Sequence, residues 1–296
     1  MLASYGYLTY VLLTFEKYDE FFFSIKQASF LQLSWLLVVL ALLPLNLFFE
    51  SAKWKLIVSK TEIINLKIAF KAVLAGFSSG FFTPNRTGEF LGRIIFLQKT
   101  NRKAGVVYSV INSLTQNLIL VLCGLPAAVI YFIIVNKDIS PGMEMYFYAI
   151  AAILIALLFF YFALPALAKT KLWKRYLSFS SDITQYSRND LAQILSFSLA
   201  RYAIFSFQLY AMLQFFGVGI EVWQALLVIP ANYLFVTFTP SLAFSEAAIR
   251  SSYAVFFISA VSTQTAGIAF AGISIWLINF GIPMLAGAIM LVNKKD

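Results

Sequence analysis

The chain has 296 residues, of which 61% are hydrophobic and only 12% are charged, and its formal net charge is +9. Soluble domains are about half apolar and about a quarter charged, so this composition excludes a soluble globular protein and indicates a polytopic membrane protein. The chain contains no histidine and a single cysteine, Cys123, which excludes a His/Cys metal site and the usual Ser-His and Cys-His nucleophile pairs.

The first half of the chain predicts three membrane spans and one interrupted segment. The expected spans are residues 1–15, 28–49 and 105–135. The first is short: at ~1.5 Å per residue it reaches roughly 22 Å of a ~30 Å core, so it continues into the interface or the true start lies upstream. Between the other two, residues 72–83 and 87–97 are each about half a bilayer long and meet at Pro84. We therefore expect a re-entrant hairpin that enters and leaves on one membrane face.

The second half repeats this pattern. Spans are expected at residues 144–168, 191–216 and 262–292, with a second interruption at Thr239-Pro240 inside segment 222–258. The two prolines are 156 residues apart, and the spans that follow the interruptions start 157 residues apart. The predicted fold is therefore an all-α, single membrane domain (1–296) with about six transmembrane helices and two re-entrant helical hairpins. Residues 1–140 and 141–296 would form an inverted repeat, as in many secondary transporters.

The distribution of Lys and Arg predicts the orientation. With loop 50–62 placed in the cytoplasm, thirteen of these residues fall on cytoplasmic segments and three on outside segments, which is the positive-inside pattern. We expect a multi-pass protein of the plasma (inner) membrane with both termini cytoplasmic. The same bias accounts for the positive net charge, so no nucleic-acid partner is expected.

Two acidic residues, Glu89 and Glu246, are the ones that we expect within membrane-embedded sequence. Each is followed four residues later by an arginine, Arg93 or Arg250. Residues i and i+4 share a helix face, so each pair can neutralise itself where an unpaired charge costs about 2.5–3.5 kcal/mol. Two interpretations stay open: the pairs are structural clamps within each hairpin, or they line a shared site.

Two features favour the shared site. Thr83-Pro84 and Thr239-Pro240 are helix-start signals, which would direct backbone N–H groups of two half-helices to the midplane, where they favour an anion. Arginines also outnumber acids, and a phosphate would neutralise the excess. The predicted substrate-binding residues, with no metal and no cofactor, are Arg86, Glu89, Arg93, Arg201, Glu246 and Arg250.

Other polar residues recur on the predicted spans. They are Ser109, Asn112, Ser113 and Gln116 on one span, Ser198 and Gln208 on another, and Asn232, Tyr233 and Asn279 further on. Polar residues inside a membrane commonly hydrogen-bond between packed helices. The alternative is that these residues line a hydrated cavity that holds a polar headgroup.

The sequence Pro84-Asn85-Arg86-Thr87-Gly88-Glu89, with Arg93 after it, resembles the Pro-x-Arg-x-Gly-Glu signature of the lysylphosphatidylglycerol synthase transmembrane region, also called the flippase-like family. Lys53-Trp54 resembles that family's Arg-Trp pair, with lysine substituted. The second motif departs from the family, which tends to have glycines between the proline and the glutamate, because residues 241–245 contain none.

The resemblance implies an integral inner-membrane protein that binds or translocates phospholipids or lipid-linked intermediates. By matching position, it implies roles for Arg86, Glu89, Arg93 and Glu246. Synthase activity is not expected, because in the family it belongs to a cytosolic domain that this sequence does not contain.

The predicted function is therefore a flippase-like protein for a lipid with an anionic headgroup, with membrane lipids as partners, and not an enzyme. One alternative is a proton-coupled secondary transporter of a small anionic solute. The other is a non-transporting subunit that presents lipid to a separate cytosolic lipid-modifying enzyme, docked on loop 169–190.

Overall fold

A computed structural model describes residues 29–136, 143–170 and 180–292, and within these ranges the chain is helical and has no strand. The predicted all-α fold is therefore confirmed, while the expected span 1–15 lies outside the described residues. The helices of the first half are α3 (Phe30–Val58), α4 (Leu66–Gly80), η1 (Pro84–Arg86), α5 (Glu89–Ile94), η2 (Lys99–Asn101) and α6 (Arg102–Asn136). Those of the second half are α7 (Met143–Leu167), α9 (Ser180–Ile183), α10 (Arg188–Phe215), α11 (Val222–Phe238), α12 (Ala243–Ile258), α13 (Thr265–Trp276), the π-helical segment η3 (Leu277–Gly281) and α14 (Ile282–Val292).

Four of the described helical segments are long and apolar enough to cross a bilayer. They are Phe30–Val58, Lys99–Val135, Met145–Leu167 and Thr265–Val292. α10 has 28 residues and is also long enough, but it is less apolar than the other four and carries Arg201. The helices are those of a polytopic membrane protein, as predicted.

The predicted end of the second span at residue 49 is wrong. α3 continues to Val58, with Pro44 inside it, so Glu50 and Lys53 lie within the helix and not in a basic loop. The side chains of Lys53 and Trp54 are fully buried. A charged residue is normally taken as the end of a predicted membrane span, because burial of an unpaired charge is costly. Here the charged residues are buried together with ion-pair partners from other helices.

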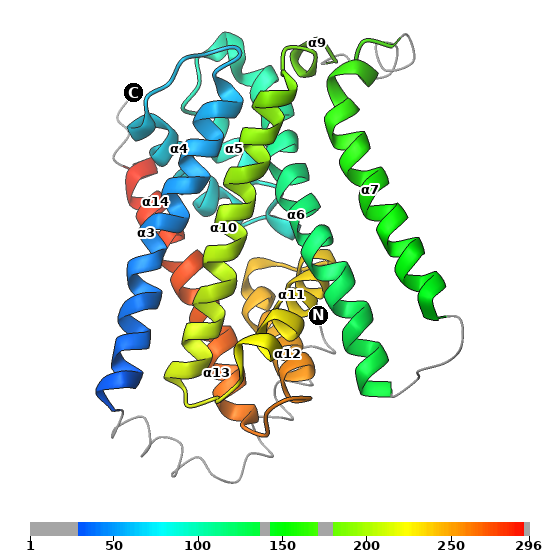
Figure 1. The fold of residues 1–296 in the computed structure, drawn as a ribbon. Helices are drawn as coiled ribbons and strands as arrows, with labels where there is room; N and C mark the ends of the chain where they lie inside the picture. The colour runs from blue at the N-terminus through cyan, green and yellow to red at the C-terminus, as the bar shows by residue number, and fades with distance from the viewer. Residues whose placement is uncertain (1–28, 137–142, 171–179, 293–296) are drawn as a thin grey trace.

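Two helical hairpins extend into the bundle from opposite ends, and their tips meet inside it (Figure 1). α4, η1 and α5 form the first hairpin, and α11 and α12 form the second. α14 packs against the first hairpin and α6 against the second, while α3 and α10 pack along each other. The two hairpins thus lie between long helices that hold their tips in the interior.

Small residues allow the two arms of the first hairpin to approach closely. Gly92 of α5 faces the carbonyl oxygen of Ala75 of α4, where an added Cβ would collide with it. Ser79 of α4 accepts a hydrogen bond from the Gly92 amide (3.1 Å) and donates one to the Gly88 carbonyl (2.8 Å). Such contacts between backbones are a common basis of helix packing in membranes, where apolar burial alone gives little driving force.

Both Thr-Pro sequences interrupt helices, but neither begins a half-helix. Pro84 begins the three-residue turn η1, and α5 starts only at Glu89. Thr239 is the C-cap of α11, because its hydroxyl donates to the Phe235 carbonyl at 2.7 Å. The threonine hydroxyls were expected to cap the next helix, but each donates to a carbonyl oxygen of the preceding turn. Thr83 also accepts a hydrogen bond from the Gly88 amide at 2.6 Å.

Candidate functional site

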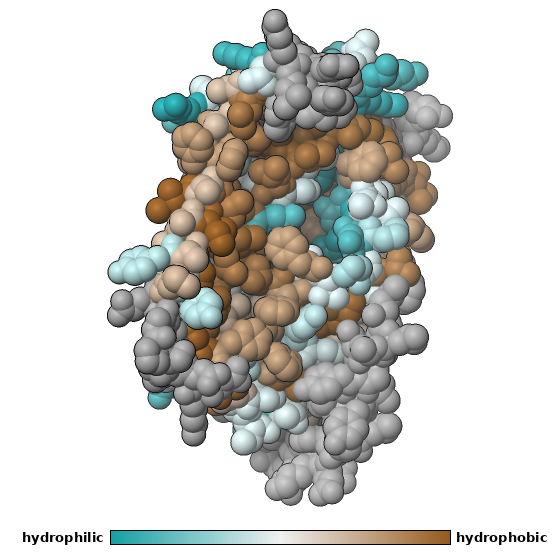
Figure 2. All heavy atoms as spheres, turned by 90° about the vertical axis from the view of Figure 1, so that its right-hand side faces the viewer, coloured by the Kyte–Doolittle hydropathy of each residue, from teal (hydrophilic) through white to brown (hydrophobic). Residues whose placement is uncertain are grey.

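A cavity of about 920 Å³ lies where the two hairpin tips meet. Its walls come from α3, α4, η1, α5, α6, α10, α11, α12, α13 and η3, and they combine charged, amide and aromatic side chains. Figure 2 looks at one side of the helix bundle and shows hydrophilic residues gathered in a hollow on a largely hydrophobic face, about midway along the helices. The cavity is therefore a polar site that opens sideways.

All six predicted site residues line this cavity. Arg86 comes from η1, Glu89 and Arg93 from α5, and Arg201 from α10, while Glu246 and Arg250 come from α12. The structure thus places side chains more than 150 residues apart in sequence around a common space.

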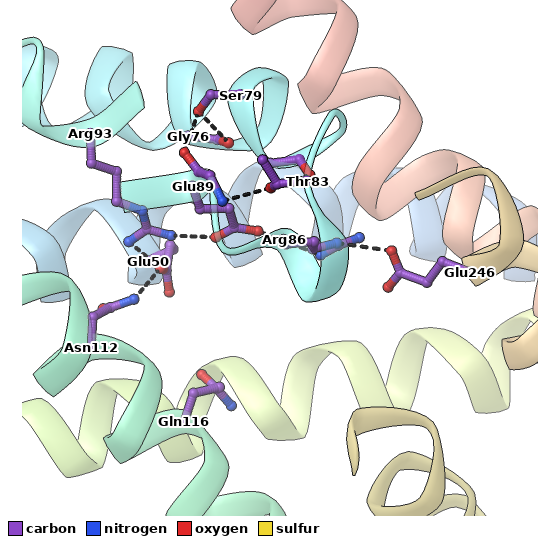
Figure 3. A network of polar contacts seen from close by, with 12 residues as sticks. Glu50, Gly76, Ser79, Thr83, Arg86, Glu89, Arg93, Asn112, Gln116 and Glu246 are labelled. Carbon is purple, nitrogen blue, oxygen red and sulfur yellow. Dashed lines mark hydrogen bonds and ion pairs between the residues drawn. The ribbon is translucent and has the colours of Figure 1, made fainter. Parts of the chain in front are cut away.

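The two predicted intrahelical ion pairs are present. Glu89 contacts Arg93 at 3.1 Å, and Glu246 contacts Arg250 at 2.7 Å. Arg86 joins them, because its Nε lies 2.9 Å from Glu246 Oε2 and its Nη1 lies 3.8 Å from Glu89 Oε1. Figure 3 shows these side chains in a row, from Arg93 through Glu89 and Arg86 to Glu246. The two intrahelical pairs lie within their own hairpins, and the Arg86–Glu246 pair connects the two hairpins.

A second connection joins the hairpin tips through the backbone. The Asn85 amide donates to the Ser241 carbonyl at 2.8 Å, and the Ser241 amide donates to Asn85 Oδ1 at 2.7 Å. Asn85 and Arg86 have φ values of 49° and 56°, in the left-handed region that residues with a Cβ rarely adopt. This conformation places the Arg86 guanidinium 3.7 Å from the centre of the Phe280 ring. We call the Asn85–Ser241 pair and the Arg86–Glu246 ion pair together the tip lock.

The expectation that Glu89 and Glu246 are the embedded acids is incomplete, because Glu50 of α3 is also buried in the cluster. Its carboxylate contacts Lys53 at 3.1 Å, Arg93 at 2.8 Å and Arg201 at 2.9 Å. Asn112 of α6 donates a further hydrogen bond to it at 2.9 Å. Arg201, which has no acidic neighbour in sequence, is therefore neutralised across helices.

Three carboxylates and five cationic side chains form one continuous cluster, so it carries a formal excess of two positive charges. Glu50, Lys53 and Arg93 are its deep members, with side chains at most 4% exposed. Arg86, Arg201 and Arg250 are 18–24% exposed and face the cavity. The accessible part of the cluster is therefore mainly cationic.

Comparison with protein families matches residues 2–287 to the lysylphosphatidylglycerol synthase TM region. The chain belongs to this family. The resemblance drawn from the residues around Pro84 is thus confirmed, and the match covers nearly the whole chain. No curated protein and no solved structure matches it.

On α3, the Lys53-Trp54 pair was the sequence signal that pointed to the deep cluster. Lys53 is an ion-pair partner of Glu50, and the Arg93 guanidinium lies 5.5 Å from the centre of the Trp54 ring. The hydropathy pattern could not reveal this, since both residues follow an apolar run and read as the start of a loop.

Amides continue the polar cluster towards the middle of the bundle. Arg201 Nε donates to Asn46 at 3.0 Å, Asn46 donates to Asn279 of η3 at 3.1 Å, and Asn279 donates to Gln208 at 2.9 Å. Asn279 and Gln208 therefore make interhelical hydrogen bonds, which is the first of the two roles expected for the polar residues of the spans. The second expected role, a polar lining of the cavity, also has support, because this cavity is lined by Asn46, Asn112, Gln116 and Asn279. Two of their polar atoms, Asn112 Oδ1 and Gln116 Nε2, are buried and have no hydrogen-bond partner among the described residues.

The chemistry available in the cavity is that of anion binding. The charged groups that line it are guanidiniums and paired carboxylates, and among the described residues no group of three or more His, Cys, Asp or Glu could hold a metal ion. Guanidinium groups bind phosphate oxygens with two parallel hydrogen bonds, so a phosphate is the ligand that this donor set fits best.

Proposed function

We propose that this member of the family is a flippase-like protein that binds a phospholipid or lipid-linked intermediate by its phosphate-bearing headgroup and moves it across the membrane. The observation that supports this most directly is the position of the cavity. It is polar and cationic, yet it opens about midway along a hydrophobic side of the bundle (Figure 2).

A sideways opening favours an amphiphile over a small solute. A hydrophobic side of a helical membrane protein faces lipid, so a ligand that enters there comes from the bilayer. Val106, Val110 and Leu114 of α6 line the cavity and are exposed, beside the polar Asn112 and Gln116 on the same helix. The headgroup would contact the amides and arginines, and the acyl chains would stay along the exposed apolar residues.

The arrangement of the hairpins supports movement as well as binding. In this proposal each hairpin is re-entrant, and the two halves form the inverted repeat expected from the sequence. The packing of α14 on α4 and of α6 on α11 fits that relation, since these pairs exchange places between the halves. Exchange of the Arg86–Glu246 pair of the tip lock for an Arg86–phosphate pair would link substrate binding to a second conformation.

The test is lipid translocation in proteoliposomes with tail-labelled phospholipids. The wild-type protein is expected to move lipid faster than empty vesicles, and Arg201→Gln to reduce the rate about tenfold or more, because a hydrogen bond to a charged group contributes roughly 1.5–3 kcal/mol. Lys99→Gln is the matched control, because it removes one positive charge at an exposed position outside the cavity. Equal rates for the wild type and empty vesicles would overturn the proposal.

The same vesicles separate the alternatives. Uptake of a soluble phosphate ester that depends on a pH gradient, without lipid movement, would indicate a secondary transporter. The docking of a separate cytosolic enzyme on loop 169–190 stays a prediction, and residues 171–179 of that loop lie outside the described residues.

A further inference from the structure

The acidic residues of the cavity are all engaged. Among the described residues that line it, the carboxylates are Glu50, Glu89 and Glu246. Glu50 contacts three cations, and Glu89 and Glu246 contact two each. A ligand with an ammonium group would therefore have to compete with a guanidinium for every carboxylate that it could reach.

The cations at the cavity surface, in contrast, retain binding capacity. Arg86 uses Nε and Nη1, Arg201 uses Nε and Nη1, and Arg250 uses Nε and Nη2. One terminal nitrogen of each guanidinium has no hydrogen-bond partner among the described residues. The three come from η1, α10 and α12, so a ligand bound to them would connect both hairpins to the long helix α10.

The net charge of the cluster indicates which net charge the ligand needs for a neutral complex. With an excess of two positive charges, a group with two negative charges neutralises the site. A phosphodiester, with one negative charge, leaves one cation uncompensated in a partly desolvated position, and such a charge is costly within a membrane. A lysyl group adds cations to a site that already has too many.

We infer that the cavity selects a lipid phosphate monoester over singly charged phosphodiester lipids and rejects lipids with a lysylated headgroup. This inference rests on the proposed function and narrows its substrate class. It also separates this chain from the lysylated lipid in the name of its family. A phosphate monoester carries close to two negative charges above its second pKa of roughly 6.

Gln116 offers a way to change this selectivity without truncating a side chain. Its Oε1 lies 3.5 Å from both Arg201 Nη1 and Lys53 Nζ, at the edge of the cavity. Gln116→Glu has nearly the same shape and would place one more negative charge beside two cations. The excess would then fall to one positive charge, which a phosphodiester neutralises.

The experiment compares translocation of tail-labelled phosphatidic acid, phosphatidylglycerol and lysylphosphatidylglycerol in proteoliposomes at pH 8. The wild type is expected to move phosphatidic acid at least about tenfold faster than phosphatidylglycerol, because one uncompensated charge at close range exceeds that factor in a medium of reduced dielectric constant. Lysylphosphatidylglycerol is expected to move no faster than in empty vesicles. In Gln116→Glu the preference should reverse in favour of phosphatidylglycerol, because the monoester would then leave one negative charge uncompensated, whereas Lys99→Gln should keep the preference for phosphatidic acid.

The outcomes distinguish this inference from the proposed function. Equal or faster movement of phosphatidylglycerol or the lysylated lipid in the wild type overturns the inference and leaves lipid translocation in place. No movement of any lipid overturns both. Transport of glycerol 3-phosphate, measured in the same vesicles, without movement of phosphatidic acid would show that the site takes a soluble monoester and overturns the lipid part. An unchanged preference in a folded Gln116→Glu variant would contradict the role of net charge.

Discussion

Glu50 is the residue on which the charged cluster depends, because its carboxylate contacts three cations. Its side chain is 1% exposed, and the groups around it come from α3, α5, α6 and α10. Charges taken out of water are tolerated only when their partners are in place, so the loss of one carboxylate leaves several cations without compensation.

We expect Glu50→Gln to destabilise the protein by about 3–5 kcal/mol or to prevent folding, as removal of one partner of a buried ion pair does. Thermal unfolding in detergent measures this. Lys53→Met in the same background is expected to recover part of the loss, because it removes one of the uncompensated cations. An unfolding temperature of Glu50→Gln equal to that of the wild type would contradict the central position of this carboxylate.

The sequence predicted the local part of this cluster and missed the rest. Glu89–Arg93 and Glu246–Arg250 could be predicted because a spacing of four residues places both side chains on one face of a helix. Lys53 is a local partner of Glu50, but both residues were assigned to a loop. The other two partners, Arg93 and Arg201, are 43 and 151 residues away, and only the packing of separate helices brings them to Glu50. Because these distant partners cannot be recognised in the sequence, a charged residue such as Glu50 after an apolar run is interpreted as the end of a span.

At the scale of elements, the first hairpin tip depends on a residue that tolerates a left-handed backbone. Asn85 has φ 49° and also supplies the side-chain oxygen that binds the Ser241 amide. Asparagine and glycine adopt this conformation more readily than other residues. The two roles of Asn85 can therefore be separated by substitution.

Asn85→Gly is expected to lower stability by about 1 kcal/mol, because it keeps the backbone conformation but loses one hydrogen bond. Asn85→Ala is expected to lower it by a further ~1–2 kcal/mol, because a Cβ disfavours the left-handed region. Thermal unfolding of the two variants in detergent gives the order. Equal stability of the glycine and alanine variants would show that the left-handed turn is not required.

Other features of the elements were not predictable from local sequence. Segment 262–292 was correctly expected as one span, but the π-helical turn η3 within it, where Asn279 bonds to Asn46 and Gln208, was not expected. π-helical turns often occur at functional sites, and this one carries both Asn279 and Phe280 into the cavity. The Thr-Pro sequences were correctly expected to interrupt helices, but the threonine hydroxyls do not cap the next helix in the expected way, because each donates to a carbonyl of the preceding turn.

At the scale of the whole molecule, composition was enough for the fold class. Long apolar runs predicted helices because only helices satisfy all backbone groups within one segment in lipid. Composition could not show that the hairpin tips meet, since that depends on contacts such as Asn85–Ser241 between the halves. The sequence also placed Lys53 in a cytoplasmic loop. The count of Lys and Arg residues that predicted the orientation therefore includes one residue that is buried inside the bundle.

The orientation stays a prediction that cysteine labelling can test. In a Cys123→Ala background, Lys99→Cys changes a residue of η2, which is expected in the cytoplasm, and Gly219→Cys changes a residue of the α10–α11 turn, which is expected outside. A Cβ at Gly219 meets no atom within 4 Å, so this change should not disturb packing. An impermeant maleimide added to intact cells should label only the Gly219→Cys variant. Labelling of both variants would contradict the arrangement of hairpins from opposite ends, and labelling of Lys99→Cys alone would invert the predicted orientation.

The tip lock also limits how the two halves can separate. Its two hydrogen bonds, one between backbone groups and one to the Asn85 side chain, and its ion pair all involve the adjacent residues Asn85 and Arg86 on one short turn. Withdrawal of that turn would break all three contacts together, so in the proposed function the tip lock would open in a single step. Glu246 would then keep Arg250, whereas Arg86 would lose its closest counter-ion, and an arriving phosphate would take the place of the carboxylate.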